Sequence, residues 1–324
     1  MKYILVMLNN SLFITLLSEL QNDDRVTTYL MNYPLKNPFL QFIRRVHTSA
    51  YLSQYIHLPY KGIWYRDLKK TVTNDSCLIL TTEILSKIDL GFFRDIRKIH
   101  PSCKFVLLVM DSMHAHSLHM KYARPKILKF SWDIVLSFDR NDCEEFGFTY
   151  MGGSFYTMYH KLTPDNQISD LYYIGYAVGN RPQMVFDIYD KLNPIQIKCN
   201  FGIAGYKGTY KRGINFFKKS IPYVDVVRGV LSTNCILEIL QEGQQAQTAR
   251  YYEAVCYNKK LLSNNPNLTK LKFYNPRYMH YFKDIKDIDP NWIKKKENIN
   301  YYYKDEFSPI HILEIIENKL SNKK

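Results

Sequence analysis

The sequence has few features of a metal-binding, disulfide-stabilised or membrane-spanning protein. Its six cysteines stand apart from one another, and none forms a CxxC pair. This spacing argues against zinc and is typical of reduced thiols in a cytosolic protein. The N-terminal apolar run ends at Asn9, too short for a secretory signal, and we expect it to form a core strand. No apolar run approaches the roughly 20 residues of a spanning helix, so any membrane contact should be peripheral.

Acidic residues are scarce relative to basic ones. The 324 residues include 30 Asp and Glu against 44 Lys and Arg, which gives a net charge of +14. This charge suits an anionic partner, whether nucleotide phosphates, a nucleic acid or an anionic membrane surface. The chain has no RNA-recognition, KH, zinc-finger or helix-turn-helix signature. We therefore predict no nucleic-acid partner, and keep a basic nucleic-acid-binding protein as an alternative function.

Apolar runs alternate with helical patterns along most of the chain. Predicted strands fall at residues 77–82, 104–111, 133–139, 148–150, 171–177, 195–203, 235–240, 260–264 and 278–282. Predicted helices fall at residues 12–20, 83–100, 141–146, 181–192, 222–231, 248–257 and 307–320. Continuous apolar strands that alternate with helices indicate an α/β fold with parallel sheets covered on both faces.

The periodic pattern is interrupted at residues 152–169, which are rich in Gly, Pro, Asp and Asn. Such a composition is typical of a linker, and we place the domain boundary there. The sequence therefore predicts an N-terminal domain over residues 1–155, a second domain over residues 170–300 and a C-terminal helix within residues 301–324.

Residues 21–75 are less regular than the rest. They include FLQFIRRVHTSAYLSQYI, which begins at Phe39 and mixes apolar and basic positions at helical spacing. One interpretation is an amphipathic helix on a membrane, with Arg44, Arg45 and His47 at the lipid headgroups. The other is an ordinary helix that faces the core.

The most informative segment is residues 238–265, EILQEGQQAQTARYYEAVCYNKKLLSNN. An apolar strand ends in a polar loop, a helix follows over residues 248–257, and a second strand begins. The helix carries one acid, Glu253, next to Ala254. Such a unit offers a helix N-terminus to an anionic ligand and a carboxylate to a neighbouring hydroxyl, and a nucleotide-linked sugar requires both.

Four segments resemble bacterial glycosyltransferases of capsular polysaccharide and lipopolysaccharide O-chain biosynthesis. They are residues 133–156, 172–181, 221–240 and 247–266, and residues 271–279 also fit. The resemblance implies a GT-B-like fold, in which two Rossmann-like domains face each other across a cleft. It also implies transfer of a sugar from a nucleotide-sugar donor to a surface polysaccharide. The acceptor would be a glycan or lipid-linked, and the protein would be peripheral at the inner face of the cytoplasmic membrane.

The same resemblance implies roles for residues of the second domain. Glu253 matches the acid that accepts hydrogen bonds from the donor ribose in GT-B enzymes. Arg250 would contact the diphosphate, or would instead pair with Glu253 as a local ion pair. Thr248 would cap the helix or hold phosphate. Gly175 and Arg181 match the strand and turn that open the donor domain.

The sequence departs from the family pattern at two positions. Ala246 stands where the family has Gly, which restricts a close approach of the backbone to the donor. Asn180 stands where a basic residue is expected. The first departure keeps open a third function, a non-catalytic transferase-like subunit that docks an active one. Two polar residues of the same loop, Gln244 and Gln245, are interpreted as loop residues, whereas Gln247 could contact a sugar.

Glycosyl transfer needs charge stabilisation for the leaving diphosphate and a base for the acceptor hydroxyl. GT-A enzymes stabilise the diphosphate with a metal on a DxD motif. The one similar triplet here, Asp287-Ile288-Asp289, lies near the C-terminus and is interpreted as a loop. We therefore expect a metal-independent enzyme, with arginine and helix-end N–H groups in place of a metal. We expect no cofactor besides the nucleotide-sugar co-substrate.

The catalytic base is expected at the carboxyl end of a strand in the N-terminal domain. Asp111, which ends the strand KFVLLVMD, is the first candidate, and His114 and His116 in the same loop are the second. Asp139 is a further candidate at the end of DIVLSFD. The spacing of His114, His116 and His119 is a weak metal pattern because no acid or Cys partner lies nearby. For each of these residues the alternative is a polar cap on the following helix.

Overall fold

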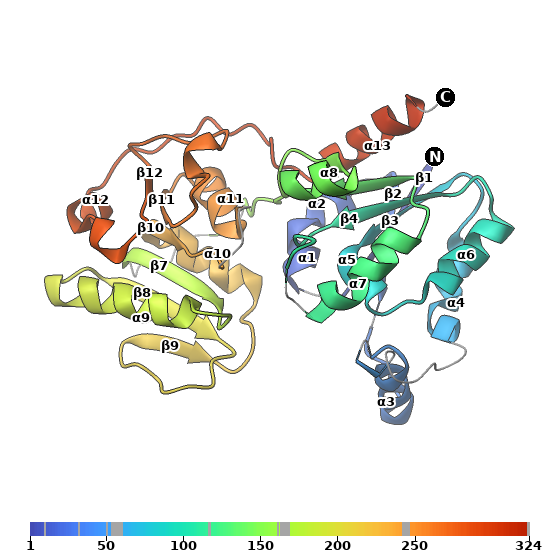
Figure 1. Cartoon of the computed structure of the whole chain (residues 1–324), viewed down its shortest axis with the longest axis horizontal. Coiled ribbons are helices and arrows are strands. Elements are labelled where there is room, and N and C mark those ends of the chain that lie inside the picture. Colours follow the sequence, from blue (N-terminus) through green and yellow to red (C-terminus); the bar gives the residue numbers. More distant parts are fainter. Residues whose placement is uncertain are drawn as a thin grey trace. The chain divides into compact units, whose positions relative to one another are not determined.

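The computed structural model describes residues 1–9, 11–31, 33–49, 51–52, 61–115, 118–160, 162, 169–241 and 247–322. The chain divides into two compact units (Figure 1). Unit 1 comprises Met1–Thr157 and Phe307–Lys324, and unit 2 comprises Met158–Glu306. None of the helices formed by the described residues combines the length and the apolar character of a bilayer-spanning segment.

Six parallel strands form one sheet in the described part of unit 1, in the order β2-β1-β3-β4-β5-β6. They are β1 (Lys2–Leu8), β2 (Val26–Met31), β3 (Ser76–Thr81), β4 (Lys104–Val109), β5 (Ile134–Ser137) and β6 (Thr149–Tyr150). All of the β3 residues, SCLILT, are buried. A strand that helices cover on both faces requires such a continuous apolar run.

Helices of unit 1 pack aromatic rings against this sheet. Phe93 lies edge-on to Phe105 of β4 with ring centroids 6.2 Å apart, and Phe130 lies 5.4 Å from Phe105. The helices are α1 (Ser11–Leu16), α2 (Ser18–Gln21), α3 (Pro38–His47), η2 (Lys61–Tyr65), α4 (Arg66–Thr71), α5 (Thr82–Leu85), α6 (Leu90–Ile99), α7 (Leu118–Lys129) and α8 (Arg140–Phe146).

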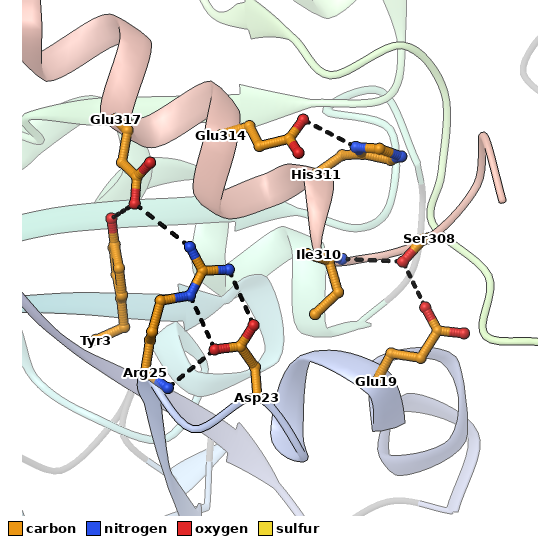
Figure 2. A network of polar contacts seen from close by, with 9 residues as sticks. All are labelled: Tyr3, Glu19, Asp23, Arg25, Ser308, Ile310, His311, Glu314 and Glu317. Carbon is orange, nitrogen blue, oxygen red and sulfur yellow. Dashed lines mark hydrogen bonds and ion pairs between the residues drawn. The ribbon is translucent and has the colours of Figure 1, made fainter.

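The C-terminal helix α13 (His311–Ser321) packs on the first residues of the chain (Figure 2). The Tyr3 hydroxyl donates to Glu317 at 2.8 Å, and Arg25 lies 3.7 Å from the same carboxylate. The hydroxyl of Ser308, just before the helix, donates to Glu19 of α2. These contacts explain why the end of the chain belongs to unit 1.

Six parallel strands also form the sheet in the described part of unit 2, in the order β12-β11-β10-β7-β8-β9. The strands are β7 (Ser169–Tyr176), β8 (Cys199–Ala204), β9 (Ile214–Phe217), β10 (Thr233–Glu238), β11 (Lys260–Ser263) and β12 (Met279–Tyr281). From β9 inward, the first three strands lie in reverse order beside the last three. This is the strand order of Rossmann domains.

Most helices of unit 2 lie in the connections between these strands, and the last two follow β12. The helices are α9 (Arg181–Leu192), η3 (Asn193–Ile195), α10 (Tyr223–Leu231), α11 (Ala249–Cys256), η4 (Leu268–Lys270), η5 (Ile285–Asp287) and α12 (Pro290–Lys294). Apolar residues of α9, including Val185, Ile188 and Leu192, join a core with Leu171 of β7 and Phe201 of β8. These apolar contacts hold α9 against the sheet of unit 2 along the length of the helix.

Three predicted elements are interrupted or shorter in the structure. The helix predicted at residues 83–100 is two helices, because Ser86 Oγ donates to the Glu83 carbonyl at 2.7 Å and Asp89 is extended before α6. The helix predicted at residues 12–20 is likewise split into α1 and α2. The strand predicted to begin at residue 195 begins at Cys199, since Gln196 has a left-handed φ of 58°.

Several elements of the structure have no counterpart in the prediction, among them two strands and the helix α7. The strands β2 and β9 lie at the sheet edges and have mixed burial, so their sequences lack a continuous apolar run. The helix α7 contains Pro125, which the rules for helix interiors disfavour. Local sequence patterns therefore did not predict strands that are partly exposed, or a helix that contains proline.

We predict that the packing of α13 contributes to the stability of unit 1. Leu313 is fully buried on this helix, so Leu313→Ala should lower the free energy of unfolding by about 2–5 kcal/mol. Urea denaturation followed by circular dichroism measures this change. The neighbouring Glu314 is exposed, and Glu314→Ala should change stability by less than about 0.5 kcal/mol. Equal unfolding midpoints for the two variants would contradict the packing described above.

Candidate functional site

The strand order of unit 2 reverses at β7, which pairs with both β10 and β8. In open α/β sheets, ligands bind at such a reversal, beyond the carboxyl ends of the strands. β7 leads into α9, and β10 leads through a longer connection into α11. The residues predicted to bind a donor lie along these two connections: Gly175 and Arg181 on the first, and Thr248, Arg250 and Glu253 on the second.

Glu238, the last residue of β10, holds the start of α11. Its buried Oε1 accepts hydrogen bonds from the backbone N–H and the hydroxyl of Thr248, each at 2.8 Å. Its Oε2 accepts a hydrogen bond from the Ser263 hydroxyl of β11 at 2.6 Å. Burial raises the pKa of Glu238, and the hydrogen bonds from Ser263 and Thr248 oppose this rise. The sequence analysis missed Glu238, although an acid at the end of an apolar strand was a usable signal.

Glu253 points into unit 2. Its side chain has 0% exposure, and Oε1 accepts hydrogen bonds from the Tyr223 hydroxyl at 2.5 Å and from Arg250 Nη2 at 2.6 Å. Burial raises the pKa of Glu253 to about 7, against the opposing effect of the Arg250 charge. Within the described residues, Oε2 has no hydrogen-bond partner. An unsatisfied buried carboxylate oxygen is costly, which makes it a candidate acceptor for a ligand hydroxyl.

Two arginines lie at the same edge of the sheet. Arg250 makes the local ion pair with Glu253, one of the two arrangements considered for it. Arg181 is half-buried at the first position of α9, and its Nε has no hydrogen-bond partner among the described residues. Burial raises the pKa of the Tyr173 phenol to about 12, while the charges of Arg181 and Arg250 lower it. Both guanidinium groups therefore lie near one phenol.

The connection from β7 to α9 depends on two glycines. A Cβ on Gly175 would lie 2.4 Å from the Tyr173 hydroxyl, so glycine at this position makes room for a neighbouring tyrosine. Gly179 has a φ of 55°, a conformation that favours glycine over other residues. Asn180, the residue that replaces an expected basic one, is the N-cap of α9 and makes no side-chain cap hydrogen bond.

The polar loop before α11 is described only at its ends. The side chain of Gln247 donates to the Tyr252 hydroxyl at 2.8 Å, so it contacts the protein rather than solvent alone. Gln244, Gln245 and Ala246 lie outside the described residues.

The lysines that follow α11 have structural partners. Lys259 Nζ donates to the carbonyls of Leu231 and Thr233 at 2.8 and 2.9 Å. Lys260 is fully buried and its Nζ donates to the Trp292 carbonyl at 2.5 Å. Burial lowers the pKa of both lysines. Within the segment that resembles glycosyltransferases, these two lysines therefore have a structural role.

In unit 1, Asp111 lies beside His119. Asp111 follows β4, and its Oδ2 is 3.4 Å from His119 Nε2 near the start of α7. The hydrogen bond to Asp111 and the charge of Glu83 raise the pKa of His119, against the effect of burial. Glu83 follows β3 and is itself buried, which raises its own pKa. The sequence analysis identified Asp111 but missed the contribution of Glu83.

The other predicted base candidates have different surroundings. His114 Nε2 lies 2.8 Å from Glu145, and both side chains are more than half exposed. Asp139 accepts a hydrogen bond from the Asn141 N–H at 2.9 Å and so caps α8, which was the alternative role considered for it. His116 lies outside the described residues.

The residues that could have formed a metal site have other roles. Asp287 completes a capping box with Asp284, and Asp289 caps α12 by accepting from the Asn291 N–H at 2.8 Å. Over the described ranges, no group of three His, Cys, Asp or Glu side chains is arranged to hold a metal ion.

A cavity of about 370 Å³ in unit 2 is lined by residues other than the predicted donor residues. Its lining comes mainly from β7, β8, β9 and α10, and includes Tyr172, Asn200, Asn215 and Arg228. None of the five predicted donor residues lines it. The candidate site is therefore the edge of the sheet where the strand order reverses, at the carboxyl ends of β7 and β10.

Comparison with known proteins identifies similar folds. No protein-family model and no curated protein matches the chain. Among solved structures, an alpha-glucosyltransferase in complex with UDP-glucose and DNA containing an abasic site is 11% identical, with a TM-score of 0.60 over 99% of both chains. An alpha-glucosyltransferase with UDP and a mismatched 13-mer DNA is 11% identical, with a TM-score of 0.58 over 98% of this chain and 100% of that one.

A putative UDP-N-acetylglucosamine 2-epimerase from Listeria monocytogenes is also similar. It is 9% identical, with a TM-score of 0.55 over 99% of this chain and 97% of that one. At such identities the likeness shows the fold alone. Together with the two parallel sheets, it confirms the predicted α/β fold with two Rossmann-like domains of the GT-B type.

We predict that Glu253 makes stability depend on pH. Its pKa of about 7 in the folded protein lies above the usual value of 4.5, so the folded state binds more protons between these values. The free energy of unfolding should therefore fall as pH rises from about 4.5 to 7, by about 3 kcal/mol for this residue. In Glu253→Gln this contribution should be absent, which urea denaturation across this pH range measures.

Other buried acids titrate in both proteins, so the informative quantity is the difference between wild type and variant. Glu314→Gln, at an exposed acid, serves as the control and should follow the wild-type curve. If the stability of Glu253→Gln changed with pH in parallel with wild type, the pKa of the Glu253 carboxyl group would not be raised.

Proposed function

We propose that this protein transfers a sugar from a nucleotide-sugar donor to an acceptor hydroxyl, and that unit 2 binds the donor. The main support is the arrangement at the carboxyl ends of β7 and β10. There Arg181 begins α9, Arg250 lies in the first turn of α11, and the buried acid Glu253 has one oxygen without a hydrogen-bond partner among the described residues. The N-termini of α9 and α11 follow these strands, and helix N-termini favour phosphate groups.

Each of these groups has a role in the proposed donor complex. Arg181 and Arg250 would bind the diphosphate, to which the planar guanidinium group is well matched. Glu253 would accept a hydrogen bond from a ribose hydroxyl through Oε2. Thr248 would position the start of α11 through its hydrogen bonds to Glu238. Gly175, near the end of β7, would leave room for the Tyr173 side chain beside the donor.

The reaction needs charge stabilisation and a base. As the sugar–phosphate bond breaks, arginine side chains and helix N–H groups would stabilise the departing diphosphate, so the proposed enzyme is metal-independent. Asp111 would take the proton of the acceptor hydroxyl. His114, which is paired with Glu145 at an exposed position, is the second candidate.

The proposed acceptor is a surface polysaccharide, of the capsule or of lipopolysaccharide, as a glycan or lipid-linked chain. The resemblance of residues 133–156 and 247–266 to enzymes of these pathways supports this proposal. The proposed location is the cytoplasm, at the inner face of the cytoplasmic membrane, where nucleotide sugars and lipid carriers would meet.

DNA is a second candidate acceptor. Two similar structures, with TM-scores of 0.60 and 0.58, are alpha-glucosyltransferases in complex with DNA. The net charge of +14 also suits a polyanion. Binding to duplex DNA that weakens steeply with salt, together with sugar transfer to DNA, would favour this acceptor over a polysaccharide.

We predict that a nucleoside diphosphate stabilises the wild-type protein and that Arg181→Ala removes most of this effect. Thermal shift assays with UDP, GDP, dTDP and CMP identify the nucleotide, because a ligand that binds only the folded state raises the Tm. Loss of a charge-assisted contact should weaken binding by about 10- to 100-fold. Arg277→Ala, which breaks an exposed ion pair with Glu297, should bind as wild type. Equal affinities for both variants would remove Arg181 from the donor site.

We predict that Asp111→Asn lowers kcat by about 100-fold or more and leaves donor affinity unchanged, because the variant lacks the base but retains unit 2. Mass spectrometry of products, with the donor identified above and either lipid-linked glycans or duplex DNA, measures the rate and identifies the acceptor. Asp139→Asn is the control, since Asp139 caps α8. Full activity of Asp111→Asn would exclude it as the base. Absence of transfer or donor hydrolysis by wild type would favour a non-catalytic subunit.

A further inference from the structure

The helix α3 of unit 1 exposes three of its apolar residues, while Ile43 and Val46 are half-buried. Phe39 is 69% exposed, Leu40 44% and Phe42 62%. Arg44, on the same helix, is buried. An ordinary surface helix has the opposite arrangement, with its apolar stripe toward the core and its charges toward solvent. Of the two interpretations of this segment, a helix whose apolar residues face the core is therefore wrong for these three residues.

Polar contacts hold α3 in this orientation. The guanidinium group of Arg44 donates to the Tyr33 carbonyl and, at 2.9 Å, to Gln41 Oε1. Asn37 caps the helix by accepting hydrogen bonds from the Phe39 and Leu40 N–H groups. At the other end, Trp64 Nε1 donates to His47 Nδ1 at 3.1 Å. The protein therefore fixes the polar side of α3 and leaves the apolar side outward.

The charge around α3 has one sign. Residues 25–66 contain six Lys and Arg and no Asp or Glu. Of the basic residues next to the apolar side chains, Lys36 and Arg45 are exposed. Two tyrosines of the same stretch, Tyr33 and Tyr51, are exposed as well. Exposed aromatic and aliphatic side chains flanked by lysine and arginine are the composition of helices that lie in the interface of an anionic membrane.

The size of α3 fits the same partner. A helix of 10 residues is about 15 Å long, half the thickness of a hydrocarbon core, so it can lie in the interface but cannot cross it. In Figure 1, α3 lies away from the sheet of unit 1. A second copy of the chain would bring like charges together at this surface, whereas anionic headgroups would neutralise them.

We propose that α3 docks the protein on an anionic lipid surface. Phe39, Leu40 and Phe42 would enter the boundary between headgroups and acyl chains, and Lys36 and Arg45 would contact the headgroups. The proposal deepens the membrane association included in the proposed function by naming the surface responsible. It does not require sugar transfer, because lipid binding is measured without a donor or an acceptor.

Vesicle co-sedimentation of the full chain tests this proposal. Wild type should bind vesicles of phosphatidylcholine with 30% phosphatidylglycerol, and should bind pure phosphatidylcholine and high-salt samples much less. Phe39→Ser with Phe42→Ser should weaken binding at least tenfold, because the two largest apolar groups are lost. Lys36→Glu with Arg45→Glu should abolish the preference for phosphatidylglycerol. Tyr302→Ser, at an exposed aromatic residue of unit 2, is the control and should bind as wild type.

Three results would overturn the proposal. The first is failure of wild type to bind anionic vesicles, and the second is binding of both double variants as tight as that of wild type. The third is a dimer, detected by light scattering, that the Phe39→Ser and Phe42→Ser changes dissolve, which would assign this surface to a second copy. Thermal stabilisation by the nucleoside diphosphate should persist in all variants, so loss of lipid binding is distinguishable from failure of the proposed donor site.

Discussion

The buried carboxylate of Glu238 connects three elements at the edge of unit 2 where the candidate site lies. It ends β10, accepts a hydrogen bond from Ser263 of β11 and accepts two from Thr248 at the start of α11. Burying a carboxylate is costly unless donors surround it, and three donors are present here. Because Glu238 holds Thr248, it also sets where Arg250 and Glu253 lie, one turn farther along the helix.

Both units consist of a parallel sheet with helices, and the same geometric constraint therefore holds in each. All strands of a parallel sheet end at the same edge, so residues that follow different strands come together there. In unit 1 this edge places Glu83 after β3 and Asp111 after β4, with His119 beside Asp111. In unit 2 it places Arg181 after β7 and Arg250 after β10, near one tyrosine. Two acids and a histidine thus gather at this edge in unit 1, and two arginines with the buried acids Glu238 and Glu253 in unit 2.

Elements with strong local signals could be predicted from the sequence. The helix Arg181–Leu192 was predicted at the same residues, because Pro182 in the first turn and an apolar stripe mark it. The central strands β3, β4 and β10 were predicted for their continuous apolar runs. The edge strands β2 and β9 and the proline-containing α7 lacked such signals. Asp111 could be singled out because it follows a strand, and Arg250 and Glu253 because they lie on the helix after the polar loop.

The alternation of apolar runs and helices by itself determined the α/β fold with parallel sheets, since periodicity is a local property of the chain. The two Rossmann-like domains were implied by the resemblance to glycosyltransferases. Only the tertiary structure decided that Glu253 is buried against Tyr223, that Asp111 meets His119 and that α13 returns to unit 1. It also decided that α3 turns Arg44 inward and its phenylalanines outward. These outcomes depend on contacts between residues distant in sequence, and on hydrogen bonds whose partners no local pattern specifies.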